Sequence, residues 1–240
     1  MDLPIPTHLT REEAIEWLRP RVESMSLAKR WEVLHRLGIY HGEESLSGPG
    51  SSLGETAAIR AALPEIIRRF EVVSLLDVPC GDFHWMALAD LGRVRYTGGD
   101  IVPEIVAANQ ERYGTAERQF RVLDVTRDPL PRVDLIHCRD LLIHLSLDDI
   151  FRALGNIIAS GARYLLTNTY TARSENLDIP SGDFRPLNLC APPFDFPAPL
   201  ELIDERCEQG GGLYRDKAMA LWPVASLSPS CQRRKASASA

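Results

Sequence analysis

Three aspartates each close an apolar stretch of the sequence, and their spacing predicts a site that binds a nucleoside. Asp77 ends VVSLLD, Asp100 ends RVRYTGGD and Asp124 ends RQFRVLD. In an open α/β sheet, ligands bind in the crevice at the carboxyl ends of the strands. An acid about twenty residues past the first turn can accept hydrogen bonds from both hydroxyls of a ribose. We therefore expect Asp100 to hold a ribose and Asp124 to lie where an adenine edge would reach.

The small residues after the first acid predict a tight turn that a ligand can approach closely. Pro79, Cys80 and Gly81 follow the strand. Gly81 can take unusual φ values at little cost because it has no Cβ. Asp82 is placed to cap a helix that begins at His84, and the free N–H groups of that helix would point at the same ligand.

The elements that must position these residues alternate between strand and helix, which predicts a doubly wound, mostly parallel α/β sheet. Apolar runs without alternation suit strands that are covered on both faces. Residues 102–113 predict a helix with Pro103 in its first turn. After the fourth strand, Ser146 caps a helix that Gly161 ends, and RYLLTNTY supplies a fifth strand.

The two ends of the chain predict different structures. Thr10 precedes REEAIEWL in a capping-box pattern, which predicts a short helix, and residues 21–37 predict a second one. LELIDERCEQ and RDKAMALWPV flank GGG and predict a hairpin whose second strand runs antiparallel to the rest. Residues 226–240 are rich in Ser and Ala, which predicts a disordered tail.

Composition limits the classes of function. The chain has 240 residues, of which 45% are hydrophobic, and this suffices for one sizeable core. A net charge of −6 with scattered basic residues argues against a nucleic-acid groove. The start, MDLPIPTHLT, lacks a signal-peptide pattern and no apolar run could span a bilayer, so we expect a soluble cytoplasmic protein. Five widely spaced cysteines favour reduced thiols over disulfides, and no metal-ligand pattern is apparent.

The motifs, taken in order, resemble those of the class I S-adenosylmethionine-dependent methyltransferases. LLDVPCGDF resembles the first motif of that family, YTGGD its ribose-binding acid, LDVT its adenine segment, and VDLIHCRDLLIHLS its fourth strand and the loop that follows. The resemblance covers roughly residues 53–224 and implies a seven-stranded sheet with a C-terminal antiparallel hairpin. PCGDFHWM and CRDLLIHLS, together with GPGSS and FRPLNL, are similar to a bacterial subgroup whose acceptors the sequence does not identify.

The resemblance implies S-adenosylmethionine as the cofactor and assigns residues to its parts. The positions that match the cofactor motifs are Asp77, Pro79, Cys80, Gly81, Asp100, Ile101, Asp124, Val125 and Cys138. The turn after the first strand would surround the methionine part, Asp100 the ribose and Asp124 the adenine, while Cys138 would offer its backbone carbonyl to the ammonium group. Many members have Gly where this chain has Pro79, which removes a donor and fixes φ, so the turn departs from the family pattern there.

Methyl transfer requires alignment of the nucleophile, the methyl carbon and the sulfur, and in some cases removal of a proton. The resemblance implies that HCRDLLIHLS runs beside the methyl group, so a general base is expected in that loop. His144 is the first candidate, because its unperturbed pKa of about 6.5 suits proton uptake at neutral pH; packing against Leu145 is the alternative. Asp140 and Arg139 are the next candidates, although Arg139 could instead pair with Asp140 or Asp124.

Two loops are predicted to close the site. Residues 42–56 are rich in Gly and Ser, and they form either a plain linker or a cover whose Ser51 and Ser52 hydroxyls reach the cofactor's carboxylate. Residues 170–199 are too long for an ordinary connection, which is typical of a lid or an acceptor wall. The side chains there that could hold a polar organic acceptor are Tyr170, Asn176, Asp183, Phe184, Arg185, Asn188 and Phe194.

We expect N-terminal helices and a cover loop over residues 1–52, and over residues 53–225 a domain that methylates an oxygen or nitrogen of a small or modestly sized organic acceptor. Two other classes stay open, and the oligomeric state is not indicated. An NAD-dependent oxidoreductase would share the strands and the ribose acid, but it should carry G-x-G-x-x-G after the first strand, and VPCGDF lacks this pattern. A non-catalytic module could bind the cofactor and use the acceptor side for a protein partner. Each acid alone could also simply end a strand in solvent.

Overall fold

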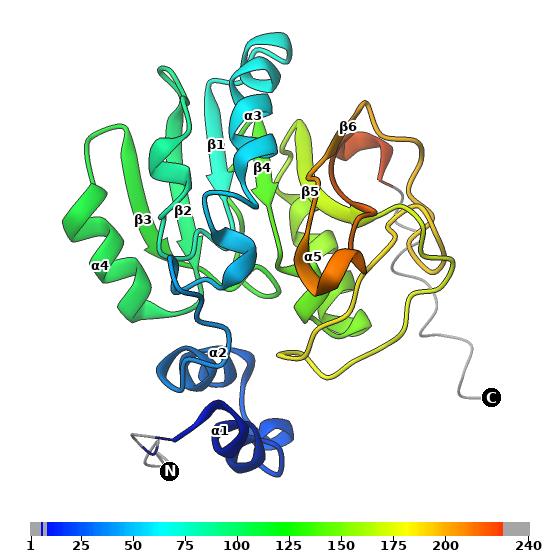
Figure 1. Ribbon diagram of the computed structural model, residues 1–240. Helices are drawn as coiled ribbons and strands as arrows, with labels where there is room; N and C mark the ends of the chain where they lie inside the picture. Colours follow the sequence, from blue (N-terminus) through cyan, green and yellow to red (C-terminus); the bar gives the residue numbers. More distant parts are fainter. Residues whose placement is uncertain (1–5, 7–8, 228–240) are drawn as a thin grey trace.

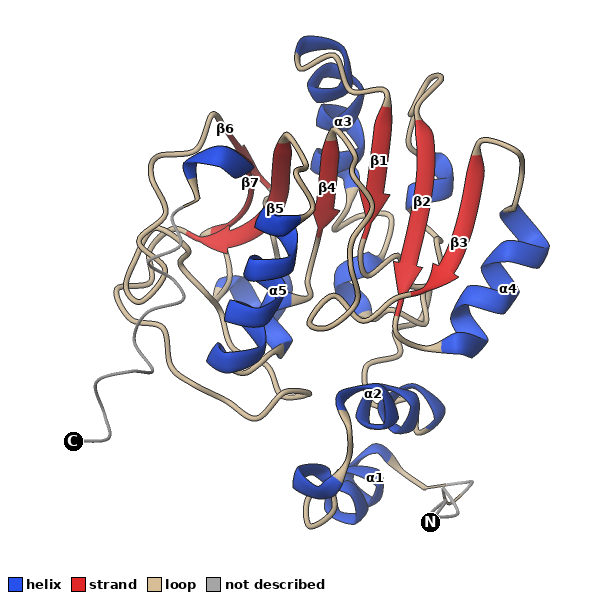
Figure 2. Cartoon of the chain, turned by 180° about the vertical axis from the view of Figure 1, so that it is seen from behind, coloured by secondary structure: helices blue, strands red, loops and turns tan. Residues whose placement is uncertain are grey.

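The computed structural model of the chain describes residue 6 and residues 9–227. A seven-stranded sheet runs through the molecule and carries helices on both faces (Figures 1 and 2). The strand order is β3-β2-β1-β4-β5-β7-β6; β7 is antiparallel to both neighbours, and the other adjacent pairs are parallel. The doubly wound, mostly parallel sheet and its C-terminal hairpin are therefore confirmed.

The strands in the middle of the sheet bury both of their faces, whereas the two edge strands stay partly exposed. They are β1 (Ser74–Asp77), β2 (Arg95–Asp100), β3 (Arg118–Val122), β4 (Leu135–Cys138), β5 (Tyr164–Tyr170), β6 (Glu201–Asp204) and β7 (Lys217–Pro223). In β1, Leu75 packs into one hydrophobic cluster and Leu76 into the other, and both are fully buried. Asp77 and Asp100 are the last residues of parallel neighbouring strands, so both carboxylates lie at the same edge of the sheet.

Five α-helices pack against this sheet or beyond its edge. They are α1 (Arg11–Leu18), α2 (Leu27–Arg36), α3 (Ala57–Arg69), α4 (Pro103–Tyr113) and α5 (Leu147–Ala159). Residues of α3 and α4 share one core cluster, and residues of α5 belong to the other. The α5 helix begins where Ser146 Oγ accepts a hydrogen bond from the Asp149 N–H, and the chain leaves the helix at Gly161, whose φ is 69°. These two helix signals act as predicted.

The N-terminal helices lie beyond the carboxyl ends of the parallel strands, as both ribbon views show (Figures 1 and 2). Thr10 and Glu13 form the predicted capping box of α1. The two helices share a small core of their own, made of Ala14, Leu18, Val33, Leu34 and Ile39. This arrangement brings α2 over the edge of the sheet that carries the acids.

Two predicted boundaries near the chain ends are wrong. Residues 21–37 do not form one helix, because Ser26 is extended and its Oγ accepts a hydrogen bond from the Lys29 N–H, which starts α2 as a separate helix. The predicted tail starts too early: Leu227 is buried in the core, and the rest of that tail lies outside the described residues.

The helix predicted after β1 is replaced by a turn. Gly81 and Phe83 adopt left-handed φ values of 51° and 58°, which a right-handed α-helix cannot accommodate. Only the 3-10 helix Met86–Leu88 follows. The Asp82 carboxylate does not cap that helix; it turns instead toward Ser45 and the residues that follow Ser45.

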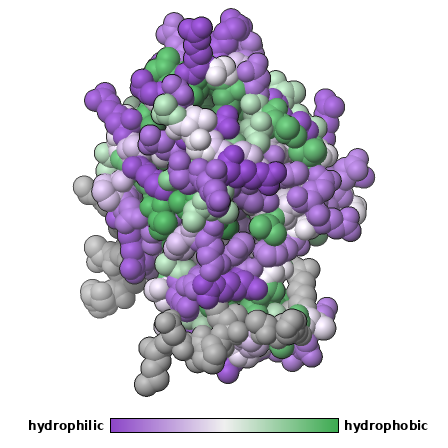
Figure 3. All heavy atoms as spheres, turned by 90° about the vertical axis from the view of Figure 1, so that its left-hand side faces the viewer, coloured by the Kyte–Doolittle hydropathy of each residue, from purple (hydrophilic) through white to green (hydrophobic). Residues whose placement is uncertain are grey.

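Hydrophilic side chains cover most of the face on the α4 side of the molecule (Figure 3). In the described part of the chain, no helix combines the length and the apolar character that crossing a bilayer requires. The apolar residues of the fold are instead gathered in its interior on the two faces of the sheet.

Candidate active site

A cavity of about 440 Å³ opens at the carboxyl ends of β2, β1, β4 and β5 and at the start of β7. Residues of α2 and of the cover loop, together with Phe184 and Tyr214, complete its walls. This volume is typical of small-molecule sites, which occur at this edge of open α/β sheets. A larger hollow of about 900 Å³ between α3 and β6 contains, of the residues predicted to bind cofactor or to catalyse, only Ser52 of the cover loop.

The cavity brings most of the predicted site residues together. Those that line it are Asp77, Pro79, Cys80, Gly81, Asp100, Ile101, Arg139, Asp140 and His144. Three predicted residues do not line it. Asp124 uses its carboxylate locally, accepting hydrogen bonds from the backbone N–H and the hydroxyl of Thr126. Val125 and Cys138 are buried in the hydrophobic core, and the Cys138 carbonyl accepts a hydrogen bond from the Thr167 hydroxyl at 2.6 Å.

Asp100 presents a buried carboxylate at the end of β2. One oxygen accepts a hydrogen bond from the Gly81 N–H at 3.1 Å and the other from the Val102 N–H at 3.0 Å. Burial raises the pKa of Asp100 to about 6, and the backbone donors oppose that rise. An ionised carboxylate has about four acceptor positions, so two donors leave it able to accept further hydrogen bonds.

The turn after β1 has no room for a side chain at Gly81. A Cβ there would lie 2.0 Å from Ser47 Oγ, and the left-handed φ adds strain for any other residue. The side-chain amide of Asn109 donates a hydrogen bond of 2.6 Å to the Gly81 carbonyl. The Cys80 N–H donates to the Gly99 carbonyl and ties the turn to β2. The peptide bond between Val78 and Pro79 is cis.

A buried histidine that we did not predict faces the same cavity. His137 Nδ1 lies 2.7 Å from one oxygen of the Asp77 carboxylate, and the Tyr96 hydroxyl donates to the other at 2.6 Å. His137 Nε2 has no hydrogen-bond partner among the described residues. A signal was present in the sequence, because His137 is a titratable side chain within the otherwise apolar strand LIHC.

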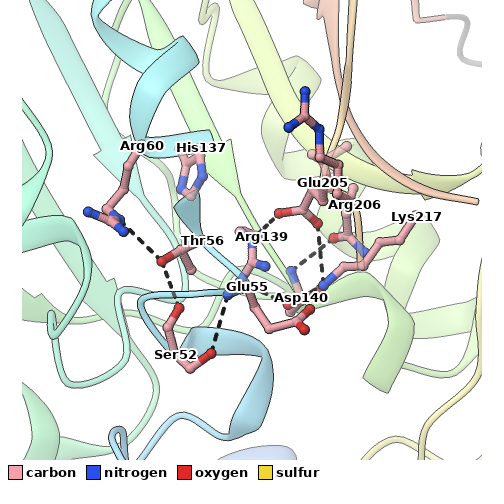
Figure 4. A network of polar contacts seen from close by, with 12 residues as sticks. Ser52, Glu55, Thr56, Arg60, His137, Arg139, Asp140, Glu205, Arg206 and Lys217 are labelled. Atoms are coloured by element: carbon pink, nitrogen blue, oxygen red, sulfur yellow. Dashed lines mark hydrogen bonds and ion pairs between the residues drawn. The ribbon is translucent and has the colours of Figure 1, made fainter. Parts of the chain in front are cut away.

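Four charged side chains form a buried group that we call the ion cluster: Arg139, Asp140, Glu205 and Lys217 (Figure 4). Arg139 lies 2.7 Å from Glu205 and 3.0 Å from Asp140. Lys217 lies 2.8 Å from Asp140 and 3.3 Å from Glu205. Glu205 and Lys217 were not predicted, because they lie more than sixty positions from Asp140 in sequence and no local pattern marks them.

The ion cluster makes Asp140 and Arg139 poor proton acceptors. Burial alone would raise the pKa of Asp140, but the charges of Arg139 and Lys217 outweigh it and hold that pKa well below its usual range. For Arg139, burial alone would lower the pKa, but the carboxylates of Asp140 and Glu205 outweigh burial and raise it. Both side chains therefore stay charged at neutral pH.

His144 lies in a different environment, between rings. Its Nδ1 lies 2.8 Å from the Asp183 carbonyl, so Nδ1 carries a proton and Nε2 is the basic nitrogen. The His144 ring centre is 4.8 Å from that of Tyr40, 5.7 Å from Phe184 and 5.9 Å from Trp31. Burial lowers the pKa of His144, and the Asp183 carbonyl partly counters this. A neutral imidazole at pH 7 can accept a proton.

The cover loop docks on the turn through one carboxylate. Asp82 accepts hydrogen bonds from the hydroxyls of Ser45 and Ser47 and from the Leu46 N–H. Of the two serines predicted to face a ligand, Ser51 lines the cavity. Ser52 does not, and its hydroxyl accepts a hydrogen bond from the Glu55 N–H.

The helices and the long loop also meet across the cavity. The Tyr40 hydroxyl donates to the Gly182 carbonyl, and Arg30 donates to the Ser181 carbonyl. The Gly182 N–H donates to the His144 carbonyl. These contacts join α2, the loop after β4 and the long loop at one side of the site.

The long loop contributes fewer cavity residues than predicted. Tyr170 and Phe184 line the cavity, and Asp183 meets His144 only through its carbonyl. The remaining candidates hold the loop itself. Arg185 donates to the carbonyls of Leu142, Leu145 and Leu177, Asn176 and Asn188 bind backbone groups, and Phe194 is buried in the core. The error arose because sequence cannot distinguish a side chain that binds the loop backbone from one that faces ligand.

Comparison with solved structures identifies the fold. The N-methyltransferase NodS from Bradyrhizobium japonicum WM9 matches with a TM-score of 0.51 over 72% of this chain and 98% of that one, at 16% identity. The chain has the class I methyltransferase fold. Human N-acetylserotonin methyltransferase, solved with SAM, matches with a TM-score of 0.47 over 89% of this chain and 69% of that one, at 15% identity. The magnesium protoporphyrin IX methyltransferase of Synechocystis PCC 6803, solved with SAH, matches with a TM-score of 0.44 over 68% of this chain and 73% of that one, at 14% identity.

The similarity to the methyltransferases is found in the three-dimensional structure and not in the amino-acid sequence. No protein-family model matches the sequence, and no curated protein sequence matches it either. Within the described residues, no group of three or more His, Cys, Asp or Glu side chains is placed to hold a metal ion. On this methyltransferase fold, the cavity at the strand ends is the site to which chemistry can be assigned.

Proposed function

We propose that the protein is an S-adenosylmethionine-dependent methyltransferase that methylates an oxygen or nitrogen of a small or modestly sized organic acceptor. The observation that carries this proposal is the Asp100 carboxylate, held by two backbone N–H groups at the end of β2 and lining the cavity. The same carboxylate can accept hydrogen bonds from both ribose hydroxyls. The class I methyltransferase fold supports this use of the cavity.

The cavity residues fit the parts of the cofactor. The backbone around Gly81, which lines the cavity beside Ser47, would approach the methionine part. His137 Nε2, oriented by Asp77, would accept a hydrogen bond from the ammonium group, which gives that buried nitrogen a partner. We propose that adenine packs against Ile101 and Ile105, which line the cavity, whereas Asp124 and Val125 do not.

The residues of this chain would act mainly by alignment and proton removal. S-adenosylmethionine, when bound, supplies a methyl group already activated by its sulfonium. Alignment of an acceptor with that group can contribute on the order of 7–11 kcal/mol. His144 Nε2 would take the proton that an acceptor hydroxyl or amine loses, which adds about 10²–10⁴-fold. Arg139 and Asp140 would position ligands rather than accept a proton, because both remain charged.

A neutral histidine favours an oxygen acceptor over a nitrogen acceptor. A hydroxyl is weakly nucleophilic until its proton leaves, so a base helps it most. His144 is neutral near pH 7 and carries its basic nitrogen on Nε2. An amine acceptor is the second possibility, and an activity profile across both classes distinguishes them.

Calorimetry tests the proposed function directly. The purified protein should bind S-adenosylmethionine and S-adenosylhomocysteine, and Asp100→Ala should weaken both. Absence of binding by the unmodified protein would contradict the proposal. Incubation with methyl-labelled cofactor and a metabolite extract then separates an enzyme, which passes the label to an acceptor, from a module that only binds. A fluorescence titration with NADH that showed tight binding would favour an oxidoreductase.

A further inference from the structure

One side of the cavity is lined by aromatic rings. Each ring centre lies within 6.2 Å of the next along what we call the ring wall: Trp31, Tyr40, His144, Phe184, Tyr214 and Tyr170. The neighbouring rings are tilted or edge-on, with interplanar angles from 35° to 82°. Such a wall offers both faces and edges, which are the surfaces that a flat aromatic ligand prefers.

The ring wall offers a sugar few hydrogen-bonding groups, namely the hydroxyls of Tyr170 and Tyr214 and the indole N–H of Trp31. The Tyr40 hydroxyl already donates to the Gly182 carbonyl, and His144 Nδ1 already binds the Asp183 carbonyl. Phe184 offers no hydrogen-bonding atom. A sugar, with hydroxyls on most of its carbons, would lose hydrogen bonds on entering this part of the cavity. A planar apolar ring would not.

The ion cluster borders the same cavity and has donors to spare. Arg139 is only 5% exposed, and its Nη2 has no hydrogen-bond partner among the described residues. Gln209 Nε2 likewise has no hydrogen-bond partner among the described residues. Lys217 has three N–H bonds, and its Nζ lies near two carboxylates, which leaves one donor. On the acceptor side, Asp140 Oδ1 and Glu205 Oε2 have no hydrogen-bond partner among the described residues, and Glu205 Oε2 lies 3.3 Å from Lys217 Nζ. The N–H groups of Arg139 Nη2, Gln209 Nε2 and Lys217 therefore still outnumber the acceptors at this end of the cavity.

The excess of donors fits a carboxylate. A carboxylate is acceptor-only, carries one negative charge and matches the planar donor geometry of an arginine. A phosphate dianion would bring a second negative charge close to Asp140 and Glu205, which already occupy this end. The cluster without a ligand has two cations and two anions, so a single added charge is the smaller perturbation.

The ion cluster lies on the acceptor side of the site. Asp100 ends β2, whereas Arg139 follows β4 and Lys217 starts β7. In the strand order, β7 is four positions from β2, which at about 4.8 Å per strand is roughly 19 Å. His144 lies close enough to Asp140 and Lys217 for their charges to influence its pKa. The proton acceptor and the ion cluster can therefore contact the same small molecule.

We infer that the acceptor is an aromatic hydroxy acid, whose ring packs on the ring wall and whose carboxylate binds Arg139 and Gln209. This inference rests on the proposed methyltransferase function and names its substrate class. In the reaction, the phenolic O–H proton passes to His144 Nε2, the oxygen forms a bond to the methyl carbon, and the carbon–sulfur bond breaks to leave a methyl ether and S-adenosylhomocysteine.

Binding to the protein saturated with S-adenosylhomocysteine tests the inference by calorimetry. The probes are 2-, 3- and 4-hydroxybenzoate, their methyl esters, the corresponding hydroxycyclohexanecarboxylates and galacturonate. At least one hydroxybenzoate should bind tenfold or more tightly than its ester and its saturated analogue, and labelled S-adenosylmethionine should convert it to the methyl ether. Equal affinity for the ester overturns the carboxylate assignment, and equal or tighter binding of a saturated ring or the sugar acid overturns the aromatic one.

Two substitutions locate the carboxylate. A Cβ at position 50 would lie 3.2 Å from Asp140 Oδ2 and 3.5 Å from Gln209 Nε2, so Gly50→Ala fills this end of the cavity. Gly50→Ala and Gln209→Ala should each weaken hydroxybenzoate binding about tenfold and leave S-adenosylhomocysteine affinity within twofold. Gly54→Ala is the matched control, because its added Cβ meets only Ser52 Oγ at 4.0 Å.

The cofactor also carries a carboxylate, and the same variants distinguish it from that of the acceptor. If Gly50→Ala and Gln209→Ala weaken S-adenosylhomocysteine binding but not hydroxybenzoate binding, the ion cluster holds the cofactor and the inference is overturned while the proposed function stands. Failure of S-adenosylhomocysteine to bind the unmodified protein removes the proposed function, and with it this inference.

Discussion

The Asp77 carboxylate lies 2.7 Å from Nδ1 of His137, at adjoining positions of β1 and β4. Both side chains are almost fully buried, and the Tyr96 hydroxyl holds the second carboxylate oxygen. Nδ1 donates to Asp77, and Nε2 has no hydrogen-bond partner among the described residues. In the proposed cofactor site, Asp77 would therefore act indirectly, because its carboxylate orients the imidazole of His137.

Replacement of this histidine should affect only the amino-acid part of the cofactor. We expect His137→Phe, which keeps a ring of similar shape, to weaken S-adenosylhomocysteine binding about tenfold or more, as loss of a hydrogen bond to a charged group predicts. Affinity for 5′-methylthioadenosine, which lacks the amino-acid part, should stay the same. Equal losses for both ligands in calorimetry would assign His137 a purely structural role.

Cofactor affinity should depend on pH through Asp100. Its pKa in the folded protein, about 6, lies above the ordinary 3.8, so the folded state binds more protons between these values. This carboxyl therefore makes folding less favourable as pH rises from about 4 to about 6. Ribose hydroxyls need the ionised form, so the dissociation constant of S-adenosylhomocysteine should be about tenfold higher at pH 5 than at pH 7.5. Asp100→Asn is the control, because its dissociation constant for S-adenosylhomocysteine should be nearly the same at the two pH values.

His144 should govern turnover rather than cofactor binding. His144→Ala should lower kcat about 10²–10⁴-fold on an oxygen acceptor, because the proton then has no positioned acceptor. Since burial lowers the pKa of His144 below 6.5, kcat of the unmodified enzyme should fall only below that pH, and the variant should lose this acid limb. Unchanged turnover in His144→Ala, measured by release of S-adenosylhomocysteine, would exclude His144 as the base.

The ion cluster should contribute strongly to stability. Lys217→Met keeps the length of the side chain but leaves Asp140 and Glu205 with one cation between them, and loss of one member of a buried ionic group costs about 3–5 kcal/mol. The free energy of unfolding in urea should fall accordingly. Arg68→Met, which breaks the exposed pair with Glu65, is the control and should leave the unfolding midpoint unchanged. Similar losses in both variants would contradict the role of burial.

Asp82 should hold the cover loop closed. Asp82→Ala removes the acceptor of three hydrogen bonds from residues 45–47, so hydrogen exchange in that segment should accelerate and cofactor affinity should fall severalfold. Asp90→Ala provides a comparison, because the Asp90 carboxylate binds only the Gly92 N–H in its own turn. Exchange rates that are the same in both variants would show that the loop docks by other contacts.

Local signals in the sequence predicted the elements of the fold well. Ser146 and Gly161 mark the two ends of α5, and Pro103 marks the start of α4. The acids at the ends of β1 and β2 lie side by side because adjacent parallel strands end at the same edge. Each helix end is set by residues only a few positions apart in the sequence, and the placement of the two acids follows from strand order alone.

The parts of the site that sequence reasoning missed depend on distant partners. Glu205 reaches Arg139 across 66 positions, and Lys217 reaches Asp140 across 77. No periodicity or capping pattern encodes such contacts. The turn after β1 was wrongly predicted as a helix for the same reason, because the Asp82 carboxylate accepts three hydrogen bonds from the distant residues 45–47 besides one from the His84 N–H.

The contact of Tyr40 with Gly182 couples two events that a methyl-transferring enzyme needs to synchronise. Gly182 precedes Asp183, whose carbonyl orients the imidazole of His144, so movement of α2 and of the segment after it that carries Tyr40 would also release that carbonyl from its position. In the proposed methyltransferase, the imidazole would then be correctly turned only while the helices shelter the reactive sulfonium from bulk water. In the proposed enzyme, one and the same displacement would expose the sulfonium to water and withdraw the proton acceptor, without any separate sensor for bound substrate.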